Sequence, residues 1–406
     1  MVSRIGLVAI SRFRWRGRFE TSRHHLVRSL AAHYDTVYLE PSPNLGRLAQ
    51  GLADRGLLKE ELAPPRSSEG VRVLRRSVPQ VPLEAFASAP RLYERLRFRQ
   101  GFALGRYVRR TAGFGDEVVL FNSHYPLRAG GLVAGLMPRV VVYHCSDEIS
   151  ELTQTATAAA RAAASAAERA AAAAADLVLA TSEPLAAKLR EVSASVHFLP
   201  NGVDVATFAP ALSPGDDPED LPPSPRMVFV GNLEHGRQEV ADADLLEALA
   251  RAQPAWSLIF IGLASRSTAV WRRLQALENV YFLGLRPRAH LASYLRAADV
   301  CLIPYVTTAL TRSIYPLKVN EYLAAGRPVV TTAFSPSLDA FRDVVDVVPA
   351  DAFVDAVAHA VTGRLGSDEA AIRRRVAVAQ ANSWDERGRR LFELVEEARR
   401  AVAVRR

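Results

Sequence analysis

The chain has 406 residues, of which 49% are hydrophobic, and it carries a formal net charge of +8 with a pI near 9.7. This length and apolar content exclude a disordered chain and support two hydrophobic cores. The positive charge is compatible with nucleic acid, anionic lipid or a phosphorylated substrate, and charge alone does not choose among them.

The first half of the chain alternates short apolar runs with helical stretches. The runs resemble buried strands and lie at 5–10, 36–40, 71–74, 118–121, 140–143, 177–180 and 196–199. Such β-rich runs separated by helices are typical of a parallel sheet with crossover helices. We therefore predict a Rossmann-like α/β domain over residues 1–208.

A stretch rich in Pro and Asp at 209–225 interrupts this alternation and predicts a linker. A second series of apolar runs follows at 227–231, 257–262, 280–284, 300–304 and 329–332. The series predicts a second Rossmann-like domain over residues 226–383, so the expected fold is α/β with two parallel sheets. A helical stretch at 384–406 follows this domain.

Residues 313–330 predict a short helix suited to a diphosphate. Pro316 fits the first helical turn, and Gly326 ends the helix. Lys318 and Glu321 lie near its N-terminal end, where free N–H groups and the helix dipole attract phosphate. The lysine adds a point charge there, and the carboxylate can accept two hydrogen bonds from a ribose diol. Only three of the 51 basic residues are lysine, which favours this interpretation over a solvated ion pair on a surface helix.

Four segments carry further motifs. They read ValTyrHisCysSerAspGlu at 142–148, LeuProAsnGlyValAspValAlaThrPhe at 199–208, AlaAspValCysLeuIleProTyr at 298–305 and ProLeuLysValAsnGluTyrLeuAlaAlaGlyArgProValVal at 316–330. Together they resemble the GT-B glycosyltransferases, in particular the bacterial glycosyl transferase group 1 and teichuronic-acid-biosynthesis-like family. The resemblance implies two Rossmann-like domains facing an interdomain cleft, with the acceptor in the first domain and the donor in the second. It also implies that the last helix packs back on the first domain.

The resemblance implies a donor site at one edge of the second sheet. Ligands of open α/β sheets bind beyond the carboxyl ends of the strands, and three strands of this domain end in glycine. A glycine alone is also what a tight strand-to-helix turn requires, and an arginine ahead of the helix is equally well a surface residue. The expected donor-binding residues are Gly231, Asn232, Gly262, Gly284, Arg286, Arg312, Ser313, Pro316, Leu317, Lys318 and Glu321. The family binds the base at the backbone of Arg286.

The chain departs from the family pattern in two places. Ser313 stands eight positions before Glu321, where the large retaining branch carries a glutamate, and the usual Gly-Gly loop after the first strand is absent. The stereochemistry of transfer is therefore open. An inverting reaction needs a base, for which Asp147 is the candidate and Glu148 and His124 are rivals, while a retaining reaction needs none. A helix N-cap is the structural alternative for Asp147.

Arginine and aromatic residues are interleaved directly after the first strand. The candidate acceptor-binding residues in this stretch are Arg14, Trp15, Arg16 and Arg18. The density of charge argues against a core element and favours a loop that binds anionic or stacked groups of the acceptor. A solvated loop is the alternative.

Residues 91–110 hold seven arginines with apolar residues among them, as in a basic interfacial helix. Such a helix would place the protein on an anionic membrane, and a plain surface helix is the alternative. The apolar run at the N-terminus is too short for a signal peptide, and no apolar stretch approaches the roughly 20 residues of a membrane span. We expect a cytoplasmic protein, with possible peripheral association at the inner membrane face.

The expected activity is glycosyl transfer from a nucleotide-diphosphate sugar, UDP- or GDP-linked, to a surface glycan, a glycolipid or a specialised metabolite. We expect no metal and no tightly bound cofactor, and we interpret Cys145 and Cys301 as buried free thiols. The alternatives are a nucleotide-sugar epimerase of the same fold and a non-catalytic protein that binds nucleotide or nucleic acid. No nucleic-acid module is recognised, and nucleic-acid binding would leave the Lys318 helix unexplained.

Overall fold

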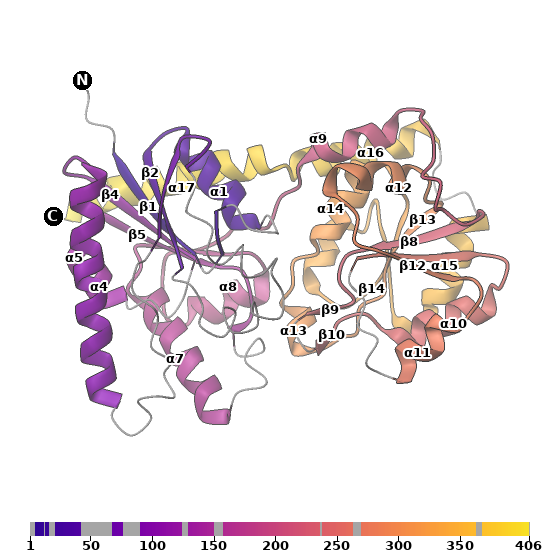
Figure 1. The fold of residues 1–406 in the computed structure, drawn as a ribbon, viewed down its shortest axis with the longest axis horizontal. Helices are drawn as coiled ribbons and strands as arrows, with labels where there is room; N and C mark the ends of the chain where they lie inside the picture. Colours follow the sequence, from indigo (N-terminus) through magenta and orange to yellow (C-terminus); the bar gives the residue numbers. More distant parts are fainter. Residues whose placement is uncertain are drawn as a thin grey trace, which may run out of the picture. The chain divides into compact units, whose positions relative to one another are not determined.

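The structure is a computed structural model that describes residues 5–11, 13–15, 21–41, 67–75, 90–123, 129–149, 157–235, 238–262, 269–362 and 368–405. The chain divides into two compact units, whose elements are labelled in Figure 1. Unit 1 consists of Met1–Thr181, Leu185–Leu199 and Arg387–Arg406. Unit 2 consists of Ser182–Pro184 and Pro200–Glu386.

Unit 1 is built on a seven-stranded sheet in the order β3-β2-β1-β4-β5-β6-β7. All neighbouring strands pair in parallel. The strands are β1 (Gly6–Ile10), β2 (Asp35–Glu40), β3 (Val71–Arg75), β4 (Val118–Asn122), β5 (Val140–Cys145), β6 (Leu177–Ala180) and β7 (Val196–Phe198). Each of the seven apolar runs of the first half is thus a strand. The order reverses between β1 and β4, the kind of point where doubly wound sheets bind ligands at their carboxyl edge.

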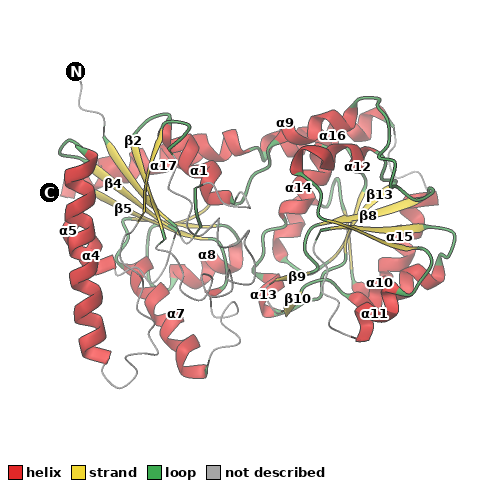
Figure 2. Ribbon diagram, in the orientation of Figure 1, coloured by secondary structure: helices red, strands yellow, loops and turns green. Residues whose placement is uncertain are grey.

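Helices cover the faces of this sheet (Figure 2). They are α1 (Ser22–Ala31), α4 (Pro90–Ala112), α5 (Ala129–Leu136), α7 (Ala158–Ala173), α8 (Glu183–Arg190) and α17 (Trp384–Arg405). Helices α4 and α5 approach closely because α5 carries glycine at the contact: a Cβ on Gly131 or Gly135 would collide with the backbone of Phe98 or Phe102. Small residues permit this backbone approach.

The last helix, α17, packs on unit 1. The rings of His33 and Phe392 stack with their centroids 3.9 Å apart. The Tyr34 hydroxyl donates to Glu396 Oε1 at 2.5 Å. Arg399 pairs with Glu117, which precedes β4. These contacts assign Arg387–Arg406 to unit 1 although the residues follow unit 2 in the chain.

Unit 2 is built on a six-stranded sheet in the order β12-β11-β8-β13-β14-β15, with parallel pairing. Its strands are β8 (Arg226–Val230), β11 (Ser257–Ile261), β12 (Val280–Gly284), β13 (Val300–Ile303), β14 (Val329–Thr332) and β15 (Asp346–Val348), beside a short pair β9 (Glu234–His235) and β10 (Gln238–Glu239). Its α-helices are α9 (Val205–Phe208), α10 (Ala243–Ala252), α11 (Ala269–Gln275), α12 (Leu291–Arg296), α13 (Ala309–Arg312), α14 (Leu317–Ala324), α15 (Phe353–Thr362) and α16 (Glu369–Ala381). Both units therefore have the predicted α/β architecture.

The acidic stretch predicted as a linker, 209–225, starts with a 3₁₀ turn at Ala209–Leu212 and lies on unit 2. Asp217 accepts from Arg226 Nη1 at 2.7 Å. Asp220 Oδ1 accepts from the Tyr294 hydroxyl at 2.8 Å, and its other oxygen pairs with Arg286. Two carboxylates of the predicted linker are thus partners for arginines of unit 2.

Candidate functional site

Three glycines meet at the carboxyl edge of the unit 2 sheet. Gly231, Gly262 and Gly284 end or follow β8, β11 and β12, which are neighbours in the sheet. The Gly231 N–H donates to Ile261 O at 2.7 Å, and the Gly262 N–H donates to Gly284 O at 3.0 Å. Their φ angles are +133°, +146° and +72°, which only glycine adopts readily. The structure therefore brings these three predicted residues together.

Helix α14 lies beside this edge. It runs from Leu317 to Ala324 with Pro316 at the N-cap, one position earlier than the first-turn placement expected from the sequence. Gly326 ends the helix with φ +70°, and its N–H donates to Leu323 O at 2.9 Å, as predicted for a glycine stop. The Tyr322 hydroxyl accepts the Val230 N–H at 2.8 Å, so α14 is fastened to the end of β8.

The Lys318 side chain reaches from α14 to the glycine edge. A Cβ built on Gly231 would lie 2.9 Å from Lys318 Nζ and closer still to Cε. The ammonium donates to the Tyr305 hydroxyl at 2.6 Å. It also lies 5.3 Å from the centre of the Phe229 ring and 5.2 Å from that of Tyr305, within cation–π range. The lysine is therefore held at the edge at a defined place.

Glu321 lies one turn further along α14 and is half-buried. Its Oε1 pairs with Arg288 Nη1 at 3.3 Å. Arg288 also lies over the Phe208 ring at 5.4 Å. The sequence reasoning did not anticipate Arg288, although it follows β12 and the predicted Arg286 by only a few residues.

The side chain of Arg286 turns toward Asp220 and Tyr294. Its Nε donates to the Tyr294 hydroxyl at 2.8 Å, and Nη2 pairs with Asp220. Hydrogen bonds to Asp220 and Tyr294 raise the pKa of Arg286. The loop after β12 therefore has a fixed conformation, with its backbone next to Gly284.

The remaining donor candidates differ in exposure. Arg312 ends α13 with its side chain exposed, and its carbonyl accepts from Ser335 Oγ at 3.1 Å. Ser313 is buried, and its hydroxyl donates to Ala309 O at 3.2 Å. Pro316 is buried, whereas Asn232 and Leu317 are exposed. Of these residues, Arg312, Asn232 and Leu317 are accessible to a ligand.

In unit 1, Asp147 follows β5 at the carboxyl edge of the sheet. Arg23 Nη2 of α1 donates to Asp147 Oδ2 at 3.0 Å, and the Ser146 hydroxyl donates to the same oxygen at 2.7 Å. The Arg23 side chain is 8% exposed and that of Asp147 is 28% exposed. Asp147 is therefore a paired carboxylate with part of its surface open. His124, one of its predicted rivals, lies outside the described residues.

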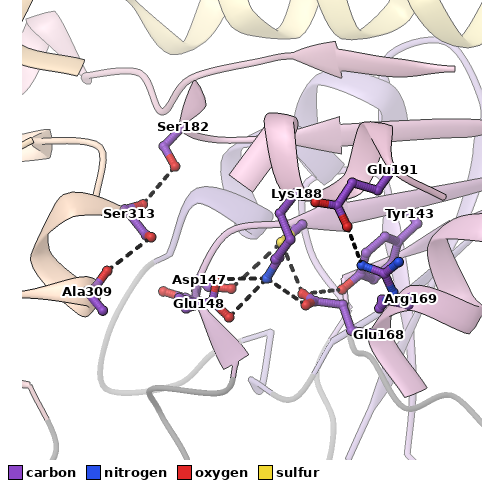
Figure 3. A network of polar contacts seen from close by, with 11 residues as sticks. Tyr143, Asp147, Glu148, Glu168, Arg169, Ser182, Lys188, Glu191, Ala309 and Ser313 are labelled. Carbon is purple, nitrogen blue, oxygen red and sulfur yellow. Dashed lines mark hydrogen bonds and ion pairs between the residues drawn. The ribbon is translucent and has the colours of Figure 1, made fainter. Parts of the chain in front are cut away.

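Glu148, the other rival, belongs to a charged network (Figure 3). Lys188 Nζ donates to both Glu148 oxygens, at 3.0 and 2.8 Å, and to Glu168 Oε2 at 2.8 Å. Glu168, 1% exposed, also accepts from the Tyr143 hydroxyl at 3.2 Å and from Cys145 Sγ at 3.3 Å. Burial lowers the pKa of Lys188, but neighbouring groups that include both glutamates outweigh it, and the net pKa is raised. Both carboxylate oxygens of Glu148 are thus engaged by Lys188 in a structural ion-pair network.

The two cysteines are buried free thiols, as predicted. Burial raises the pKa of the Cys301 thiol to about 12.

Next to Cys145 lies His144, which is fully buried and stacks on Phe121 with the ring centres 5.7 Å apart. Burial lowers the pKa of His144 to about 3, so the ring is neutral near pH 7. In the described part of the chain, no three His, Cys, Asp or Glu side chains group as metal ligands.

The interpretation that charge keeps the stretch after β1 out of the core is wrong at Arg14 and Trp15, which are 8% and 3% exposed. The Trp15 N–H donates to Glu40 Oε1, and its indole N–H donates to Ser68 Oγ, both at 3.0 Å. Its ring also packs on Tyr38 at 5.0 Å. Amphipathic side chains are buried where their polar atoms find partners. Arg16 and Arg18 lie outside the described residues.

Helix α4, which contains the basic segment 91–110, exposes apolar and basic side chains together. Its exposed large apolar residues are Leu96, Phe98, Phe102 and Tyr107. Its exposed arginines include Arg95, Arg99, Arg106 and Arg110. None of the helices in the described residues is both long enough and apolar enough to span a bilayer.

Both halves of the chain match glycosyltransferase families. Residues 224–365 match Glycosyl transferases group 1, and residues 45–207 match Glycosyltransferase Family 4. TuaH of Bacillus subtilis (strain 168), whose name assigns it to teichuronic acid biosynthesis as a glycosyltransferase, is 27% identical over 260 residues. The match covers 60% of this chain and 64% of TuaH, so the chain spans less than two thirds of that relative.

Solved structures share the fold. Sucrose-phosphate synthase from Thermosynechococcus elongatus has a TM-score of 0.67 at 18% identity, over 98% of this chain and 100% of the other. HepE from Anabaena, solved in complex with UDP-glucose, has a TM-score of 0.60 at 15% identity, over 97% of this chain and 100% of the other. These likenesses confirm the predicted GT-B fold.

Proposed function

Because this chain belongs to the GT-B glycosyltransferases, through a group 1 domain and a family 4 domain, we propose that it transfers a sugar from a nucleotide-diphosphate sugar to an acceptor hydroxyl. The donor would bind unit 2 and the acceptor unit 1. One observation carries the proposal: the Lys318 ammonium is held where Gly231 leaves room for it. A fixed cation at a glycine edge beside a helix N-terminus matches the charge and shape of a diphosphate.

The donor site would contact both the diphosphate and the ribose of its ligand. The diphosphate would accept hydrogen bonds from Lys318, while the Glu321 carboxylate, engaged by Arg288 at one oxygen, would accept from the ribose hydroxyls. UDP- and GDP-sugars both satisfy this arrangement. In the reaction the acceptor oxygen bonds to the anomeric carbon, the bond from that carbon to the diphosphate breaks, and the acceptor proton leaves. Lys318 would stabilise the charge that develops on the leaving diphosphate.

The acceptor would lie at the carboxyl edge of the unit 1 sheet, next to Asp147. We place the acceptor class among surface glycans and glycolipids, in keeping with the name of TuaH. The partly exposed Asp147 carboxylate would take the acceptor proton. Arg23 and Ser146 would orient that carboxylate.

Calorimetry on the purified protein tests the donor site. Wild type is expected to bind UDP or GDP and, with the cognate sugar nucleotide and acceptor, to release that diphosphate. Lys318→Ala is expected to weaken diphosphate binding about 10- to 100-fold, since a hydrogen bond to a charged group contributes about 1.5–3 kcal/mol. Gly231→Ala is expected to weaken it similarly, because the new methyl would displace the Lys318 side chain.

The double variant separates this mechanism from general damage. If Gly231 acts through the lysine, Gly231→Ala and Lys318→Ala will not be additive. Gly113→Ala is the control, since Gly113 also has a positive φ, +63°, but no neighbour within 4 Å of its Cβ position. Additive losses would contradict the Gly231 mechanism. Absence of diphosphate binding by wild type would overturn the proposed function, and sugar epimerisation without transfer would reassign it.

The proposal extends to an anionic membrane as the surface on which the acceptor lies. At about 100° per residue, the four exposed arginines of α4 fall on one strip of the helix. Phe98 and Phe102 border this strip on one side, and Leu96 and Tyr107 border it on the other. A cationic strip between apolar margins fits the headgroup region of an anionic leaflet.

Vesicle flotation checks this membrane assignment. The protein is expected to float with phosphatidylglycerol-containing vesicles and not with pure phosphatidylcholine. Arg99→Gln/Arg106→Gln is expected to weaken binding roughly tenfold or more, since each basic residue near an anionic surface contributes about 1 kcal/mol. Arg251→Gln/Arg373→Gln removes the same charge from exposed positions of unit 2 and serves as the control. Equal losses in the two variants would refute α4 as the binding surface.

A further inference from the structure

We infer that Tyr305 positions the Lys318 ammonium for the donor diphosphate, an inference that rests on the proposed function. Tyr305 follows β13 and is 7% exposed. Its hydroxyl oxygen accepts from Lys318 Nζ at 2.6 Å. A lysine ends in a compact charge on a flexible four-carbon stem, so this hydrogen bond fixes where the charge lies.

Tyr305 is itself held from several sides. Thr332 Oγ1 donates to its carbonyl oxygen at 2.6 Å. Its ring packs against Phe334 and Phe229, with the ring centres 4.9 and 6.3 Å apart. The phenol oxygen therefore occupies a fixed place, and the ammonium is oriented before any ligand arrives. Such preorganisation reduces the ordering cost of binding.

The partners of Lys318 are all uncharged. Among the described residues no carboxylate forms an ion pair with it, and its neighbours are a phenol oxygen and two aromatic faces. Lys188 provides the contrast, because two glutamates neutralise it. A cation held by a neutral oxygen and by ring faces keeps its charge for an anionic ligand. Within the described part of the chain, the ammonium also retains two of its three N–H groups for phosphate oxygens.

The readout is the ratio of the affinities for a nucleoside diphosphate and its monophosphate, measured by calorimetry on the full chain with UDP and UMP, and with GDP and GMP. Wild type is expected to prefer the diphosphate. Tyr305→Phe keeps the ring and removes the hydroxyl, and it is expected to lower this preference about three- to tenfold while monophosphate affinity changes little. In a Lys318→Ala background, Tyr305→Phe is expected to leave the ratio unchanged.

Tyr34→Phe is the matched control. It removes a hydroxyl of unit 1, which donates to Glu396, so it is expected to lower stability without changing the ratio. If Tyr305→Phe preserves the ratio while Lys318→Ala abolishes the preference, the positioning role is refuted and the proposed donor site stands. If Lys318→Ala also preserves the ratio, or wild type shows no preference for the diphosphate, the donor-site proposal itself fails and the inference falls with it.

Discussion

Asp147→Asn is expected to lower the rate of sugar transfer at least about a hundredfold while leaving nucleotide affinity unchanged. An amide of the same shape cannot take a proton from the acceptor, and a positioned general base contributes about 10²–10⁴-fold to such reactions. Nucleotide affinity should persist because the donor would bind unit 2. The variant keeps an oxygen acceptor for Arg23 and Ser146, so the local geometry is preserved. The measurement is turnover at saturating donor, with nucleotide binding by calorimetry beside it.

Glu148→Gln is the control for Asp147→Asn, because it makes the same kind of change at the neighbouring carboxylate. Glu148 is the next residue, but both its oxygens accept from Lys188. It is therefore expected to affect stability more than turnover. Near-normal turnover of Asp147→Asn would remove Asp147 as the base and favour a retaining reaction, which needs none.

Lys188→Met is expected to destabilise unit 1 by about 3–5 kcal/mol, because removing one partner of a buried ion pair leaves uncompensated charge. Glu168 is 1% exposed and would lose its cationic partner, as would Glu148. Methionine conserves most of the side-chain volume, so the loss reports charge more than packing. Chemical denaturation followed by circular dichroism measures the change.

Two variants show whether this loss comes from the network in Figure 3. Arg169→Met breaks the ion pair between Arg169 and Glu191, in which the arginine side chain is 41% exposed and the glutamate side chain 64% exposed. This variant is expected to change stability by no more than about 1 kcal/mol. Adding Glu168→Gln to Lys188→Met removes one of the stranded charges and is expected to restore part of the loss. Equal effects of Lys188→Met and Arg169→Met would show that the buried network has no special role.

The strands and helix α14 were predictable because their signals are local. Apolar runs such as 118–121 are buried strands because their β-branched and aromatic residues suit a sheet covered on both faces. Gly326 ends α14 because the left-handed backbone conformation that often ends a helix favours glycine. A single glycine in the sequence is enough to predict this stop. The three glycines at one edge followed from the rule that parallel strands share a carboxyl edge.

Side-chain partners were not predictable, because they come from distant parts of the chain. Nothing in the sequence next to Lys318 indicates that its ammonium donates to the Tyr305 hydroxyl. Likewise, nothing next to Trp15 indicates that Glu40 and Ser68 supply acceptors for its two N–H groups. One usable signal was overlooked. Lysine is rare in this sequence, and Lys188, like Lys318, is held at a defined place by hydrogen bonds.

The position of α17 in the sequence determines when unit 1 becomes complete during synthesis. Unit 1 begins at the N-terminus, yet Arg387–Arg406 belong to it and are translated only after unit 2. At a translation rate of about 5–20 residues per second, the sheet of unit 1 leaves the ribosome well before the partners of Tyr34 and His33 exist. Unit 2 is in effect an insertion within unit 1. Unit 1 therefore remains structurally unfinished until unit 2 has been made, which couples the maturation of the two halves.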